Sequence, residues 1–219
     1  MMISAAACTS TLPRAGRLLL TLGVLLVGTG DPAAAATPPP ITPAPAAENL
    51  VPLQEVDLME AMFREGAQLY GAGDYAGAIR AWRTPAERGH PGAQFSLGVA
   101  YATGNGVAQS LERAIEWWQA AAAQEHVRAQ LNLGLLYWRG EGVAQDLAKA
   151  RSWWRRAAAG GDPAAQFHLG ALAATGQGMT TDYKEAVRWW RLAAGQGYRP
   201  AIKGLEILES HGVSVDEIR

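Results

Sequence analysis

This sequence has almost no cysteine and no marked excess of one charge. Its 219 residues include one cysteine, Cys8, and no long acidic or basic run. One cysteine cannot close an internal disulfide or supply a cysteine-rich zinc site. The formal net charge is −1, so there is no basic excess that would predict nucleic-acid binding. The apolar fraction of 49% is too high for a disordered chain, which leaves a folded protein.

The sequence also lacks the motifs of common catalytic and cofactor sites. It contains no zinc-protease motif, no hydrolase nucleophile elbow and no nucleotide-binding loop. No two of its four histidines have the i, i+4 spacing of a helical metal site. We therefore expect no metal, no cofactor and no catalytic residues, and an enzyme is only the third functional hypothesis.

Residues 1–36 are typical of a secretory signal peptide. Arg14 and Arg17 precede an apolar run over residues 18–28, and Ala34 to Ala36 fit a cleavage site. As a helix the run would be about 16 Å long, too short for a bilayer core of about 30 Å. Cleavage would remove Cys8, leave no membrane span and place the protein in the periplasm or outside the cell. An uncleaved anchor is the alternative.

Residues 37–54 form a proline-rich segment that cannot bury a core, and polyproline II is its favoured conformation. We interpret it as a linker between the signal and the folded part. A PxxP ligand for another protein is the alternative.

A period of 36 residues organises the rest of the chain. Ala93–Gln94 recurs as Ala129–Gln130 and Ala165–Gln166, each 36 residues apart. The same step relates a leucine–glycine pair, a G-x-G pair, a tryptophan pair and an alanine pair; the tryptophan pairs are Trp117–Trp118, Trp153–Trp154 and Trp189–Trp190. So many coincidences at one spacing indicate tandem structural repeats.

Each period predicts two helices. Residues 91–103 have apolar residues at helical spacing, and Gly104 ends this first helix. Residues 111–124 form the second, which begins after Ser110; Asp146 and Asp182 are the equivalent capping residues. The G-x-G pairs follow helices rather than strands, so they predict helix caps and tight loops, not a phosphate site.

The units can be delimited along the chain. The helix pairs are 55–90, which has a shorter turn, then 91–126, 127–162 and 163–198, and residues 199–219 supply a closing helix and tail. Four pairs and one closing helix make about nine helices, so the predicted fold class is all-α. Because one pair cannot bury its own apolar face, neighbouring pairs must stack into an α-solenoid.

The 36-residue units closely resemble the Sel-1-like repeat of the tetratricopeptide superfamily, and the unit around Gly66 and Trp82 resembles an ordinary tetratricopeptide. The resemblance implies a right-handed superhelix whose first helices line a concave face. Ala173 departs from it, where the other copies have tyrosine. Glu206 stands in the closing helix where the other units have the motif glycines Gly66, Gly98, Gly134 and Gly170.

Seven of the eight tryptophans belong to second helices, where the second of each pair lies on the apolar stripe. We expect them to pack between helices. A sugar-stacking platform is the alternative interpretation.

The resemblance also implies groove-facing positions three before, one after and four after each motif glycine. These are Phe63, Ala67 and Tyr70; Phe95, Val99 and Ala102; Leu131, Leu135 and Trp138; Phe167, Ala171 and Ala174. Trp138 lies outside the second helices, so an apolar groove around it resembles a peptide-binding hot spot. Arg139 would add a charged contact. Alternatively, neighbouring first helices bury much of this row.

These patterns predict an exported, monomeric, non-catalytic scaffold that binds a protein or peptide. Some exported bacterial members of the family regulate signalling receptors and others assemble exopolysaccharide or envelope machinery, and the resemblance implies a role of this kind. The alternative is a module that binds peptidoglycan or another polysaccharide.

Overall fold

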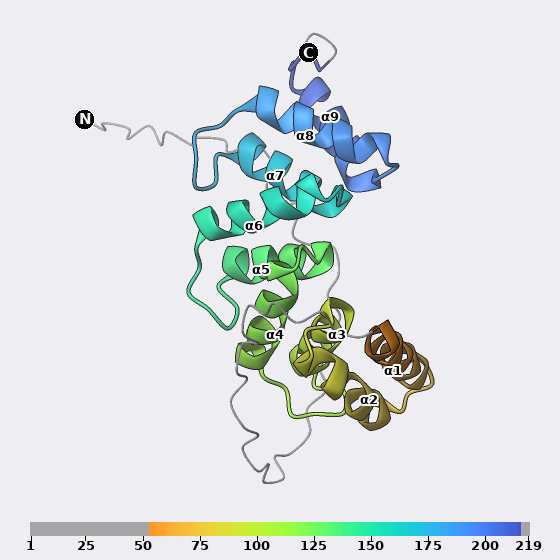
Figure 1. Ribbon diagram of the computed structural model, residues 1–219. Helices are drawn as coiled ribbons and strands as arrows, with labels where there is room; N and C mark the ends of the chain where they lie inside the picture. Colours follow the sequence, from red (N-terminus) through yellow and green to blue (C-terminus); the bar gives the residue numbers. More distant parts are fainter. Residues whose placement is uncertain (1–52, 216–219) are drawn as a thin grey trace, which may run out of the picture.

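The computed structural model describes residues 53–215, which form nine α-helices and no strand (Figure 1). The first helices of the units are α1 (Leu53–Gly71), α3 (Pro91–Thr103), α5 (Val127–Arg139), α7 (Pro163–Thr175) and the closing α9 (Arg199–Ser210). The second helices are α2 (Tyr75–Glu87), α4 (Leu111–Ala123), α6 (Leu147–Ala159) and α8 (Tyr183–Gly195). The expected all-α class and the expected helices are confirmed.

Consecutive helices pack on one another, so the units stack from α1 and α2 at one end to α9 at the other (Figure 1). The first helices α3, α5 and α7 each contact the second helix of their own unit and that of the preceding unit. This nearest-neighbour packing is the architecture of a solenoid. Within residues 53–215, no helix is both long enough and apolar enough to cross a membrane.

The proposed boundaries differ slightly from the helix limits. Helix α1 begins at Leu53, two residues inside the segment interpreted as a linker. The predicted signal peptide and almost all of the predicted linker lie outside the described residues.

Side-chain caps begin the helices of both kinds. Ser110, Asp146 and Asp182 accept a hydrogen bond from the backbone N–H three residues later, as expected for second helices. The first helices α3, α5 and α7 are capped in the same way by His90, His126 and Asp162. Both histidines are thus helix caps.

The G-x-G pairs end the first helices and join neighbouring units. Gly104, Gly140 and Gly176 have φ values of 74°, 74° and 69°, the left-handed conformation in which glycine is least strained. The second glycine of each G-x-G pair packs on the beginning of the second helix of the preceding unit. For example, a Cβ on Gly142 would lie 2.7 Å from the Cβ of Leu111, the first residue of α4. The predicted caps are confirmed, and the loops also serve as contacts between units.

Each motif glycine lies against the tryptophan of its own second helix. A Cβ on Gly134 would overlap the indole of Trp154, and the other units repeat this arrangement. The Trp154 Nε1–H donates to the Leu131 carbonyl at 3.3 Å. The equivalent bonds join Trp82 to Phe63 at 3.1 Å, Trp118 to Phe95 at 3.2 Å and Trp190 to Phe167 at 3.0 Å. The indoles are therefore buried with their N–H satisfied.

The first tryptophan of each pair also packs on the interior. Trp117 is only 6% exposed, whereas Trp153 and Trp189 are partly buried against the core clusters. The packing role expected for the second-helix tryptophans is confirmed.

Gln130 differs from its counterparts in the neighbouring repeats. Its side chain is 1% exposed, and its Oε1 has no hydrogen-bond partner within the described part of the chain. Gly160 stands where the other repeats supply a donor: Gln124 donates to Gln94 at 2.8 Å, and Gln196 donates to Gln166 at 3.0 Å. The middle repeat is thus less completely bonded than its neighbours.

Candidate functional site

Most of the residues that were expected in the groove are partly exposed on the first helices. Partly exposed are Phe63, Tyr70, Phe95, Val99, Ala102, Leu131, Leu135, Trp138, Ala171 and Ala174, while Ala67 and Arg139 are exposed. The row is therefore neither fully buried nor fully open.

Phe167 differs from the rest of the row, because its side chain is only 6% exposed. Its ring centroid lies 6.1 Å from that of Trp190 and 5.7 Å from that of Tyr198. These two aromatic residues, from α8 and the start of α9, enclose it. Phe167 is thus a core residue, and its predicted place in an accessible groove is wrong.

Trp138 joins helices α5 and α7 on the groove side. Its Nε1–H donates to Gln177 Oε1 at 3.2 Å, and its ring lies 6.3 Å from both Trp154 and His168. The guanidinium of Arg139 lies 6.0 Å from the Trp138 ring, at the outer limit of a cation–π contact. Trp138 is thus held in place while part of its surface stays accessible.

His168 stacks on Trp154, with ring centroids 4.6 Å apart and planes inclined by 14°. Burial, and secondarily the charge of Arg139, lowers the pKa of His168 from 6.5 to about 4. The imidazole is therefore neutral at pH 7. It has no hydrogen-bond partner among residues 53–215. Ser96 and Asn132 occupy the same position in their repeats as His168 does in its own, but they lie on α3 and α5.

A shallow hollow of about 370 Å³ lies among α1, α3 and α5. It is lined by Phe63, Gly92, Phe95, Ser96, His126, Val127 and Arg128. Phe63 and Phe95 were expected in the groove, but the other lining residues were not recognised from the sequence. Gly92 is the sequence signal that could have indicated this hollow. It interrupts the pattern of apolar and polar residues in the first helices, because the other units have a residue with a side chain at the equivalent position.

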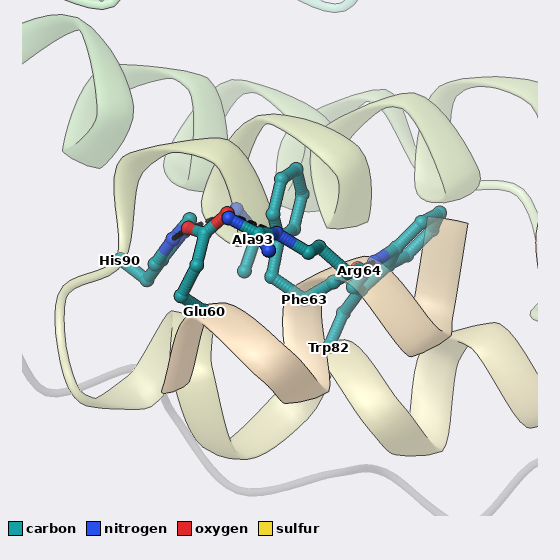
Figure 2. A network of polar contacts seen from close by, with 6 residues as sticks. All are labelled: Glu60, Phe63, Arg64, Trp82, His90 and Ala93. Carbon is teal, nitrogen blue, oxygen red and sulfur yellow. Dashed lines mark hydrogen bonds and ion pairs between the residues drawn. The ribbon is translucent and has the colours of Figure 1, made fainter. Parts of the chain in front are cut away.

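A network of polar contacts lies beside this hollow, in the first unit (Figure 2). Glu60 accepts hydrogen bonds from Arg64 Nε at 2.8 Å and from His90 Nε2 at 3.0 Å. These bonds hold the pKa of the Glu60 carboxyl below its usual value, with the His90 bond contributing most. The ring of His90 also packs on Phe63 at 4.7 Å.

Over residues 53–215 there is no group of three or more histidine, cysteine, aspartate or glutamate side chains that could hold a metal ion. The row of groove positions instead offers partly exposed aromatic and aliphatic side chains and, at Arg139, a cationic donor. Such a surface can bind a peptide or protein chain, in which apolar side chains alternate with polar groups.

The fold and this surface define a helical-repeat solenoid. Three Sel1 repeats match the family model, over residues 91–126, 127–162 and 163–198, with the boundaries that the sequence period indicates. The chain is therefore a Sel1-repeat solenoid.

Two solved structures support this assignment. A Sel1 repeat protein from Oxalobacter formigenes is 34% identical, with a TM-score of 0.66, over 71% of this chain and 65% of that one. The protein c5321, a protective antigen of uropathogenic Escherichia coli with an SLR fold, is 34% identical, with a TM-score of 0.69, over 73% of this chain and 35% of that one. This chain thus spans less than two thirds of either relative. A comparison with curated proteins finds no significant match.

Proposed function

We propose that this protein is an exported, non-catalytic scaffold that binds a protein or peptide on the groove formed by its first helices. Receptor signalling and the assembly of exopolysaccharide or envelope machinery are the settings we propose for it, in the periplasm or outside the cell, as a monomer. The signal-like segment over residues 1–36 is the basis for export.

The observation that carries the proposal is the partly exposed row of apolar side chains along the first helices, with Trp138 at its centre. In the other repeats the position of Trp138 is alanine, Ala102 or Ala174. A tryptophan oriented by its bond to Gln177 and flanked by Arg139 has the composition of a binding hot spot.

The test is capture of a partner from envelope extract by the immobilised protein, followed by measurement of its affinity. Trp138→Ala should weaken binding at least tenfold, the usual loss at a hot spot. Tyr183→Ala is the matched control, because Tyr183 is an exposed aromatic residue on α8, outside the groove. Equal affinity of Trp138→Ala and the unaltered protein would refute this use of the groove.

The second candidate ligand is a cell-wall glycan. The accessible surface of Trp138 next to the amide of Gln177 favours it, since sugars stack on aromatic faces and bond to amides. A glycan-binding protein should sediment with purified peptidoglycan and lose this property in Trp138→Ala. Failure to sediment would leave the protein-binding function in place.

A further inference from the structure

The first two units contain the same arrangement of a capping histidine over a phenylalanine. His90 caps α3 and packs on Phe63, and His126 caps α5 and packs on Phe95, each with ring centroids 4.7 Å apart. In both, Nδ1 accepts the backbone N–H three residues later, at 3.1 Å for His90 and 3.3 Å for His126. Each neutral imidazole therefore carries its proton on Nε2.

The two units differ in what receives that proton. In the first unit the acceptor is the carboxylate of Glu60, which also accepts a hydrogen bond from Arg64 (Figure 2). Glu60 lies six residues before the motif glycine Gly66, and the residue six before Gly98 is Gly92. The second unit thus has no carboxylate at this place, and Gly92 lines the hollow.

Three of the residues that line the hollow, Ser96, His126 and the exposed Arg128, carry side-chain donors with no partner in the described part of the chain. Within residues 53–215, nothing accepts a hydrogen bond from His126 Nε2, from the Ser96 hydroxyl or from the guanidinium of Arg128. No acidic residue is among those that line it. Burial lowers the pKa of His126, and so does the charge of Arg128, so the site holds a net positive charge from Arg128 alone at pH 7.

The rings of Phe63 and Phe95 supply the apolar part of the hollow. A glutamate side chain matches both features, because its methylene groups pack on rings while its carboxylate takes charge-assisted hydrogen bonds. Glu60 shows within this same chain how such a carboxylate is bound next to the equivalent histidine.

We propose that this hollow binds the side-chain carboxylate of a glutamate carried by a partner peptide, in the place that Glu60 occupies in the first unit. The carboxylate accepts hydrogen bonds from His126 Nε2 and Arg128, and Ser96 lies within the same hollow. The inference rests on the proposed protein-binding function and specifies the chemistry that the groove recognises.

The test uses a blocked peptide, acetyl-Phe-Glu-Leu-amide, and its neutral partner acetyl-Phe-Gln-Leu-amide. Titration of the full chain, followed by the NMR signals of the His126 ring, should show the Glu peptide binding at least about fivefold more tightly. His126→Asn keeps the helix cap, since asparagine is among the best capping residues, but removes the Nε2 donor. This variant and Arg128→Gln should each lower the affinity for the Glu peptide to that for the Gln peptide.

Arg188→Gln is the matched control, because Arg188 is exposed on α8, outside the hollow, and it should not change the affinity. Equal affinities for the two peptides, or unaltered binding by His126→Asn and Arg128→Gln, would overturn the inference. A captured partner that is lost with Trp138→Ala but retained with these two variants would leave the proposed function standing and remove only the glutamate site.

Discussion

At the scale of single residues, the contact between a motif glycine and an indole sets how closely the two helices of a unit approach. Trp154 is 1% exposed and lies directly over Gly134. Its Nε1–H donates to the carbonyl of Leu131, three residues before Gly134. There is no space for a methyl group between them. The glycine is therefore retained inside a helix in spite of its poor helix propensity.

Gly134→Ala should lower the free energy of unfolding by about 1–3 kcal/mol, because the added methyl group must displace the Trp154 ring. Gly195→Ala is the control, since no atom lies within 4 Å of the place that its added methyl group would take at the end of α8, and it should stabilise slightly. Urea denaturation measures both. Equal effects of the two substitutions would contradict the close contact.

His168 makes stability depend on pH. Its pKa is about 4 in the folded chain and 6.5 as a free side chain, so the unfolded chain binds more protons between these values. The contribution of His168 is complete above pH 7 and decreases as the pH falls towards 4. We expect a loss of roughly 2 kcal/mol between pH 7 and pH 5. His168→Phe keeps a ring over Trp154 and should remove this part of the pH dependence in denaturation experiments.

At the scale of helices, caps determine where each element begins. Asp182 accepts the backbone N–H of Glu185 at 2.9 Å and starts α8. Asp182→Ala should cost about 1 kcal/mol of stability, whereas Asp182→Asn should cost little, because an amide oxygen also caps. Thermal unfolding of the two variants provides the measurement, and an equal loss in both would refute a capping role.

The helices could be predicted from the sequence because their signals are local and recur three times. Pro91, Gly104 and Ser110 mark the ends of α3 and the start of α4 without any knowledge of tertiary packing. The candidate site was harder to predict, because accessibility depends on contacts between units. Phe167 has the same sequence position as Phe95, yet Tyr198 and Trp190 bury it. The hollow likewise depends on contacts between units, because residues of α1, α3 and α5 line it together.

At the scale of the whole molecule, stability is transmitted only between adjacent units. Deleting residues 199–219 would uncover Trp190, against which Gly204 packs, and remove Ala201 and Leu208 from the same cluster. Hydrogen exchange should therefore quicken most in α7 and α8 and least in α1 and α2. A uniform loss of protection along the solenoid would instead indicate a single cooperative unit.

The irregular middle repeat bears on protein engineering. An averaged sequence drawn from the three Sel1 repeats would supply the missing donor at Gly160 and place alanine at Trp138. It would also put glycine at Glu125, whose φ of 61° is strained for any other residue. Arrays built from such consensus copies should be more stable than this chain. They would also have lost the tryptophan that distinguishes one repeat from the next.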